Sequence, residues 1–154
     1  MNQEEIQILL HHRAPYLLIE KVIDISQDLI ITETKLTGEE YFFKGHFPGA
    51  PILPGAMMQE MTTQSAGILI TKFYSPVSNY NSNATKGHAL GVLKKVNFAK
   101  YKSFAKPGDT LTIKVSLEDR LENLFNFKAQ IFNDNNVIMS NSFQLINISD
   151  EYLL

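Results

Sequence analysis

The chain of 154 residues contains no cysteine, and this absence excludes several kinds of site. Without thiols there is no disulfide framework, no thiolate metal site and no cysteine nucleophile, a composition that fits a reducing compartment. No apolar run approaches the roughly 18 residues that span a bilayer. The first residues, Met1 to Glu5, lack the basic and apolar regions of a signal peptide. We therefore expect a cytoplasmic protein with no membrane segment.

Charged residues are also scarce, at 19% of the chain, where about 25% is usual for soluble domains. Hydrophobic residues, at 44%, are close to the norm, and the formal net charge is −2. The length suits a single domain over residues 1–154, because a fold of this size buries roughly 70% of the surface of its unfolded chain. The scarcity of charge is a hint that another subunit covers part of the surface.

The small net charge is an average over two unlike parts. Between Lys86 and Lys106 there are six lysines and no acidic residue, whereas the rest of the chain carries 8 basic and 16 acidic residues. A basic face steers acidic partners toward it. Phe98, Tyr101 and Phe104 alternate with these lysines, which also fits single-stranded nucleic acid, and ordinary strand edges carry lysines too. The residues alone leave these three interpretations open.

Apolar periodicity and breakers predict an α+β domain in which a single helix packs against an antiparallel sheet. Beyond Gly55 no residue breaks a helix until Gly67, and apolar side chains spread around it, so we expect a buried helix. Asp134 to Asn136 tolerate the left-handed backbone of a hairpin turn. Runs typical of strands cover residues 16–25, 29–36, 89–98, 110–117, 123–132 and 137–146.

The segment GHFPGAPILPG, residues 45–55, has three glycines and three prolines and predicts a stiff, ordered loop. His46 lies in it and could act as a base. The simpler interpretation is a loop histidine bonded to a backbone carbonyl. No two of the four histidines have the i, i+4 spacing of a zinc site, so we expect neither a metal site nor a cofactor.

Glu60 lies one and a half turns into the expected helix, among methionines, and Gln64 follows one turn later on the same face. A carboxylate in apolar surroundings is costly unless it is paired or protonated, and a protonated one can donate. The simpler alternative is a narrow stripe of Gln59, Glu60 and Gln64 that faces water. Taken separately, neither His46 nor Glu60 proves chemistry.

Together, this loop and helix resemble the FabZ-type (3R)-hydroxyacyl-[acyl carrier protein] dehydratases. GHFPGAPILPGAMMQEMTTQSAG, residues 45–67, is similar to the family pattern of a G-H-F-P-x-x-P-x-x-P-G loop followed by a helix with an acidic residue. LHHRAPYLLIEKV, residues 10–22, resembles the family segment L-P-H-R-y-P-f-L-L-v-D-r-V. The sequence Pro107-Gly108-Asp109 ahead of a long strand is a third match. These matches favour a catalytic interpretation of both His46 and Glu60.

The resemblance implies a hotdog fold, in which a sheet wraps around one long helix and two subunits form a continuous sheet. It also implies a homodimer or a trimer of dimers, with His46 of one subunit near Glu60 of the next. The implied partner is an acidic acyl carrier protein with a phosphopantetheine-linked substrate, and nucleic acid ranks last. The residues expected to bind this partner are Lys94, Lys95, Lys100 and Lys102.

In the implied mechanism, His46 takes the C2 proton of a 3-hydroxyacyl thioester and Glu60 protonates the leaving hydroxyl. The N–H group of Gly55, at the start of the helix, donates to the thioester oxygen. Methionines adapt to different acyl chains, although core packing explains them equally well. The side chains expected to contact substrate are Phe47, Met57, Met61 and Gln64.

The chain departs from the family pattern in places that put its substrate in doubt. His11 and Ala14 stand where Pro and Tyr are usual, Lys94 stands where an acid is common, and the segment 98–107 is about three residues longer. A polyene or another unusual lipid is as plausible a product as a housekeeping fatty acid. The alternatives are a hotdog acyl-CoA thioesterase or hydratase, and a non-catalytic acyl-carrier or nucleic-acid binding module.

Overall fold

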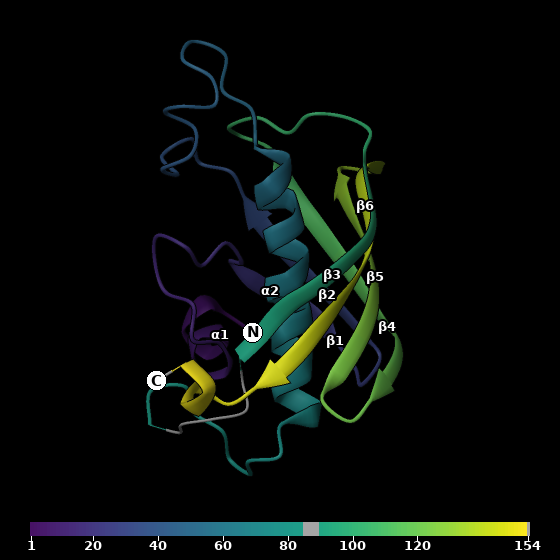
Figure 1. Ribbon diagram of the computed structural model, residues 1–154. Coiled ribbons are helices and arrows are strands. Elements are labelled where there is room, and N and C mark those ends of the chain that lie inside the picture. Colours follow the sequence, from purple (N-terminus) through teal and green to yellow (C-terminus); the bar gives the residue numbers. More distant parts are fainter. Residues whose placement is uncertain (85–89, 154) are drawn as a thin grey trace.

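A six-stranded antiparallel sheet curves around one long helix in the computed structural model, which describes residues 1–84 and 90–153 (Figure 1). The helix α2 spans Gly55–Tyr74. The strands lie in the order β1-β2-β4-β5-β6-β3. Their bounds are β1 Lys21–Ile25, β2 Leu29–Lys35, β3 Leu90–Tyr101, β4 Thr110–Leu121, β5 Leu124–Asn133 and β6 Asn136–Ile148. The α+β architecture expected from the sequence is confirmed.

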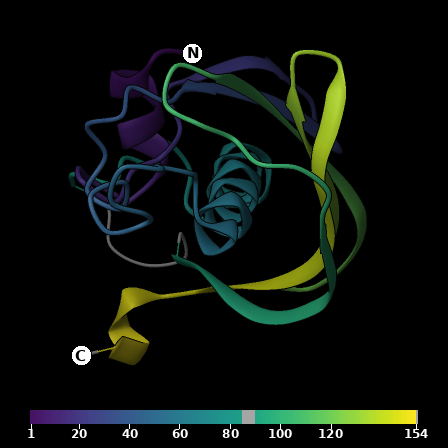
Figure 2. The ribbon, with the colours of Figure 1, turned by 90° about the horizontal axis from the view of Figure 1, so that it is seen from above.

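The core lies between α2 and the inner face of the sheet, which encloses the helix when seen from above (Figure 2). The side chains of β4 alternate between buried and more exposed positions, as expected of a sheet with one covered face. On β5 and β6 the rings of Phe125, Phe127 and Phe143 stack in sequence, with centroids 6.3 and 5.6 Å apart. Together these contacts hold the middle of α2, where every residue from Met61 to Thr71 is buried.

The first strand is shorter than the sequence indicated, because residues 16 and 17 form a turn with Arg13 and the backbone of Leu18 bonds to side chains. The Leu18 N–H donates to Gln64 Oε1 at 2.8 Å. The Leu18 carbonyl accepts from the Thr34 hydroxyl at 2.7 Å. The segment is thereby tied to α2, and strand pairing begins only at Lys21.

The sequence analysis missed two short helices, α1 at Gln3–Leu9 and a 3₁₀ helix at Asp150–Leu153. A capping box begins α1: the Glu5 N–H donates to Asn2 Oδ1 at 2.9 Å, and the Asn2 N–H donates to Glu5 Oε2 at 2.7 Å. Ile6 is fully buried and anchors the helix. No helix within the described residues is long and apolar enough to cross a membrane.

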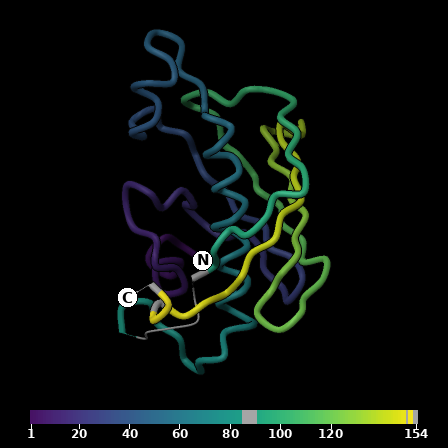
Figure 3. Tube along the Cα trace, in the orientation of Figure 1, coloured from purple at the N-terminus to yellow at the C-terminus, as the bar shows by residue number. Residues whose placement is uncertain are grey.

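Two connections meet at the N-terminal end of α2: the loop that precedes the helix and the connection from β3 to β4 (Figure 3). The Leu53 N–H donates to the Ala105 carbonyl at 2.8 Å and joins them. Ala105 is fully buried. The loop of residues 45–54 is therefore supported by a segment that follows it by about fifty positions in the chain.

Strand β3 is an edge strand that pairs with β6, and within residues 1–84 and 90–153 no other strand pairs with it. Every side chain from Val92 to Tyr101 is exposed, on both faces of the strand. Val92, Leu93 and Val96 are 40 to 41% exposed. An uncovered apolar edge of this length is a template for pairing with another chain.

Candidate active site

His46 is held in the glycine- and proline-rich loop by contacts with Ile52. Its Nδ1 lies 3.0 Å from the Ile52 carbonyl oxygen, and the Ile52 N–H donates to the His46 carbonyl at 2.9 Å. A carbonyl oxygen can only accept, so Nδ1 carries the proton of the neutral ring and Nε2 keeps a free lone pair. A histidine bonded to a backbone carbonyl was the simpler interpretation of His46, and this bond is present. The same bond also orients the imidazole ring so that Nε2 can act as a base.

The His46 ring stacks on Phe47, with centroids 4.1 Å apart and planes inclined by 26°. Phe47 forms two backbone hydrogen bonds with Ala50, of 2.9 and 3.3 Å, that close the loop. Its side chain is 51% exposed. The aromatic neighbour covers one face of the imidazole, and the loop presents both rings at the surface.

The cavity beside His46 opens at the N-terminus of α2. It has a volume of about 330 Å³, and its lining includes His46, Gly55, Met58 and Tyr101. The N-cap residue, Pro54, forms no side-chain hydrogen bond to the first turn. The positive end of the helix dipole therefore faces the cavity without a capping side chain, an arrangement suited to an oxygen that gains negative charge.

Glu60 is positioned by hydrogen bonds from its own helix. Gln64 Nε2 donates to Glu60 Oε1 at 2.9 Å, and the Thr63 hydroxyl, which donates to the Glu60 carbonyl at 2.9 Å, lies 3.1 Å from Oε2. The Glu60 side chain is 20% exposed. Gln64 is 1% exposed, so the interpretation of these residues as a stripe facing water is wrong for Gln64. Its amide instead fixes the Glu60 carboxyl group in one orientation.

His12 and Tyr16, from the segment before β1, complete the surroundings of Glu60. His12 Nε2 lies 3.7 Å from Glu60 Oε1, and the rings of His12 and Tyr16 stack with centroids 5.9 Å apart. Burial lowers the pKa of His12 below 6.5, although the Glu60 charge opposes this shift. Burial, and next the Glu60 charge, raise the pKa of the Tyr16 hydroxyl. Both groups are therefore neutral near pH 7.

His46 and Glu60 face different cavities of the same chain. The Glu60 cavity, of about 200 Å³, shares no lining residue with the His46 cavity. Its lining residues are Leu10, His12, Tyr16, Glu60, Thr63, Gly67, Gly91 and Leu93. Gly91 and Leu93 belong to β3, so the Glu60 cavity lies beside the uncovered edge of the sheet.

The methionines expected to contact substrate lie in different places. Met57 is partly buried, and its sulfur lies 3.6 Å from the Tyr41 hydroxyl. Met61 is 1% exposed and lines a depression beside Phe42 that contains neither His46 nor Glu60. Met58, which belongs to the same group of methionines, lines the His46 cavity. The roles of Met57 and Met61 stay predictions.

The lysines of the basic segment are exposed along β3 and beyond it. Lys102 lines the His46 cavity, and Lys106 lines an adjoining apolar groove with Ile52 and Phe104. Within the described residues, the lysines at 94, 95, 100, 102 and 106 form no ion pair. Lys86 lies outside the described residues. The positive charge is therefore available beside the cavity.

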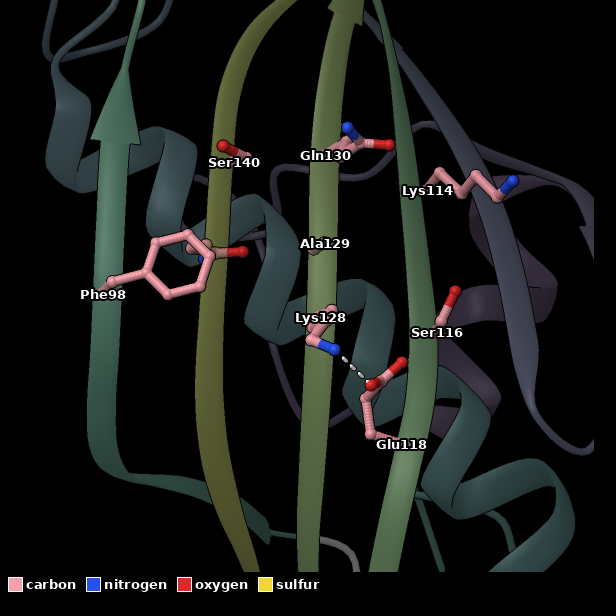
Figure 4. A pocket seen from close by; sticks show the side chains of 9 residues that line it. Phe98, Lys114, Ser116, Glu118, Lys128, Ala129, Gln130 and Ser140 are labelled. Carbon is pink, nitrogen blue, oxygen red and sulfur yellow. Dashed lines mark hydrogen bonds and ion pairs between the residues drawn. The ribbon is translucent and has the colours of Figure 1, made fainter.

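A further depression, of about 320 Å³, lies on the outer face of the sheet, away from α2 (Figure 4). Lys114 and Gln130 border it, and the Lys128 ammonium contacts the Glu118 carboxylate. None of the site residues expected from the sequence lines it. This outer depression is separate from the candidate active site.

Three residues of the site were not selected from the sequence: His12, Tyr16 and Tyr101. His12 and Tyr16 lie within the LHHRAPYLL match, so that segment was a usable signal. Tyr101 lies in the segment 98–107, and no sequence pattern indicated that it contacts Gly55. Within the described residues, no three His, Asp or Glu side chains gather as ligands for a metal ion.

The chain is similar to known proteins over most of its length. The model of a family described as the FabA-like domain matches residues 10–142. A 3-hydroxyacyl-[acyl-carrier-protein] dehydratase FabZ of Thiobacillus denitrificans is 34% identical over 135 residues, covering 84% of this chain and 86% of the relative. A bifunctional LpxC/FabZ enzyme of Porphyromonas gingivalis is 32% identical over 117 residues, or 76% of this chain, which spans 23% of that longer relative.

The fold is also found among solved structures. The dehydratase heterocomplex ApeI:P from Xenorhabdus doucetiae superposes with a TM-score of 0.77 at 20% sequence identity, over 92% of this chain and 90% of that chain. The likeness shows the same hotdog arrangement of one helix and a wrapped sheet.

Proposed function

We propose, from the premise that this chain belongs to the family of FabA-like domains, that it is a 3-hydroxyacyl-[acyl carrier protein] dehydratase. The enzyme breaks the C2–H and C3–O bonds of a (3R)-3-hydroxyacyl thioester, forms the C2=C3 double bond and releases water. The observation that carries the proposal is the orientation of His46, whose free Nε2 shares a cavity with the uncapped N-terminus of α2. A base and an oxyanion site thus lie side by side.

His46 is the base in this proposal. The Ile52 carbonyl holds the Nδ1 proton, so Nε2 takes the C2 proton of the substrate. As that proton leaves, negative charge develops on the thioester oxygen, and the Gly55 N–H donates to it with the helix dipole behind it.

Glu60 is the acid and protonates the hydroxyl that leaves C3, directly or through a water. Gln64 donates to Oε1, the Thr63 hydroxyl contacts Oε2, and together they hold the carboxyl plane fixed. Glutamate at this position resembles the FabZ-type branch of the family, and this resemblance implies dehydration without migration of the double bond. The neutral rings of His12 and Tyr16 wall the carboxyl group on the side of the N-terminal segment.

The active site is completed by a second copy of the chain. Glu60 and His46 face separate cavities in one chain, and the Glu60 cavity adjoins the uncovered β3 edge. Pairing of β3 with β3 of the partner extends the sheet, covers Val92 and Val96, and brings His46 of one subunit to Glu60 of the next. The assembly in this proposal is a homodimer. Measuring the molecular mass of the protein in solution distinguishes the homodimer from the trimer of dimers that the family resemblance also allows.

The shared site is tested by mixing two inactive chains. His46→Ala and Glu60→Gln are each expected to remove nearly all formation of conjugated enoyl thioester from a 3-hydroxyacyl carrier-protein substrate. Co-expression of the two variants produces mixed dimers with one intact site, so about a quarter of the wild-type activity returns if pairing is random. Mixed dimers with no activity would contradict the shared site, and release of free thiol would indicate a thioester hydrolase instead.

The substrate arrives on an acidic carrier protein, steered by Lys94, Lys95, Lys100 and Lys102. None of the four forms an ion pair within the described residues, and Lys102 lines the His46 cavity, which places positive charge beside the proposed active site. Changing Lys95 and Lys100, which do not line the His46 cavity, together to Glu is expected to lower kcat/KM for the carrier-bound substrate about tenfold or more at low salt. The same variant should turn over a pantetheine thioester almost as the wild type does. Equal loss on both substrates would contradict a role in carrier docking.

A further inference from the structure

Tyr101, the last residue of β3, lies directly against the first residue of α2. A Cβ atom built on Gly55 would lie 3.1 Å from Tyr101 Cε1 and 3.3 Å from both Cδ1 and Cζ. These distances are shorter than ordinary contacts between carbon atoms. The ring therefore occupies the space beside Gly55 that a side chain would need, and a methyl group there would force the ring to shift by a few tenths of an ångström.

The segment that carries Tyr101 is fixed at several points. Tyr101 pairs with Met139 of β6, and the Lys102 N–H donates to the Ile138 carbonyl at 2.7 Å. Further on, the Ala105 carbonyl accepts from the Leu53 N–H at 2.8 Å. The ring is thus held between the sheet and the loop that carries His46, in the part of the chain that is longer than the family pattern.

The Tyr101 side chain is also part of the cavity wall. It is 48% exposed and lines the same cavity as His46 and Gly55. Burial raises the pKa of its hydroxyl, so the side chain stays neutral across the physiological range. A neutral ring beside the helix N-terminus excludes water from one side of the Gly55 N–H without competing for its hydrogen bond.

We propose that Tyr101 is a positioning residue for the dehydration: its ring closes one side of the α2 N-terminus, so that the thioester carbonyl reaches the Gly55 N–H from the side that His46 faces. This inference rests on the proposed function. The ring limits the orientations of the thioester, and a fixed carbonyl places C2 next to His46 Nε2. Its effect is therefore on the chemical step more than on binding.

The test is a cycle of Gly55→Ala, Tyr101→Ala and the double variant, measured as kcat and KM for formation of the enoyl thioester. Tyr101→Ala is expected to lower kcat about 10- to 100-fold, with KM changed less than about threefold. Gly55→Ala is expected to lower kcat similarly, because the new methyl group collides with the ring. The double variant should be no slower than Tyr101→Ala, since the methyl group then fits the vacated space.

Tyr101→Phe keeps the ring and should retain at least about half of the wild-type kcat. Tyr152→Ala, at a residue that is 80% exposed in the C-terminal 3₁₀ helix, is the matched control and should behave as the wild type. Thermal unfolding of each variant checks the fold. Wild-type kcat in Tyr101→Ala, or losses that multiply in the double variant, would refute the role of Tyr101. Absence of enoyl product from the wild type would refute the proposed function instead.

Discussion

Gln64 is the residue through which the fold holds the proposed acid, and its replacement is the most informative change. The Gln64 amide forms three hydrogen bonds: Nε2 donates to Glu60 Oε1 at 2.9 Å and to the Tyr16 carbonyl at 2.8 Å, and Oε1 accepts from the Leu18 N–H at 2.8 Å. The orientation of the amide is determined, because the Leu18 N–H can only donate and the Tyr16 carbonyl can only accept.

Gln64→Leu keeps the approximate volume and removes all three bonds. The buried Leu18 N–H then has no side-chain acceptor, and the Tyr16 carbonyl loses the donor that Gln64 supplied. An unsatisfied buried group costs about 1–3 kcal/mol. The added apolar contact of leucine offsets part of this, so we expect the free energy of unfolding to fall by about 2–4 kcal/mol. Glu60 also loses a donor, and kcat should fall about 10- to 100-fold because its carboxyl group is no longer fixed.

Urea unfolding measures the first effect, and the rate of enoyl formation measures the second. Thr71→Val is a suitable control, since the Thr71 hydroxyl is buried in the same helix but bonds only to the Gly67 carbonyl, at 3.0 Å. This control should lose at most about 1.5 kcal/mol and keep its kcat. Wild-type stability together with wild-type kcat in Gln64→Leu would refute the reasoning. A loss of stability alone would show that Gln64 holds the N-terminal segment but not Glu60.

Three further changes test other parts of the structure. Partial burial raises the pKa of Glu40, but the N–H groups of Thr37 and Gly38 donate hydrogen bonds to its carboxylate. These bonds outweigh the burial and hold the pKa below 4.5. The stabilisation is therefore present above that pH and lost as the pH falls; Glu40→Gln should cost about 1 kcal/mol at pH 7 and much less near pH 3, by urea titration. Burial lowers the pKa of His12 below 6.5, so the imidazole binds a proton more readily in the unfolded chain than in the folded one. The stability of the fold therefore falls as the pH drops below about 6.5. His12→Asn should show a smaller fall over that range. Val96→Asp places a charge on the uncovered edge of β3, and sedimentation should then show monomers without dehydratase activity; an active monomer would contradict the shared site.

Some of the fold and site was readable in the sequence because the signals are local. Three prolines and three glycines between residues 45 and 55 specify a loop, and the unbroken stretch after Gly55 specifies a helix, whatever packs around them. The order of His46, Gly55 and Glu60 identified the family before any contact was known. The helix at the N-terminus was also readable, since Asn2 and Glu5 have the spacing of a capping box, and it was overlooked.

Other features depend on contacts between distant parts of the chain, which only the tertiary structure decides. Gln64 joins α2 to Leu18 across 46 positions, and the same contact shortens β1. The meeting of Tyr101 with Gly55, and the separation of His46 from Glu60 within one chain, follow from how the β3 edge and the loops pack around the end of α2. Sequence patterns report which face of an element is apolar, but a side chain's neighbour is set by the packing of whole elements.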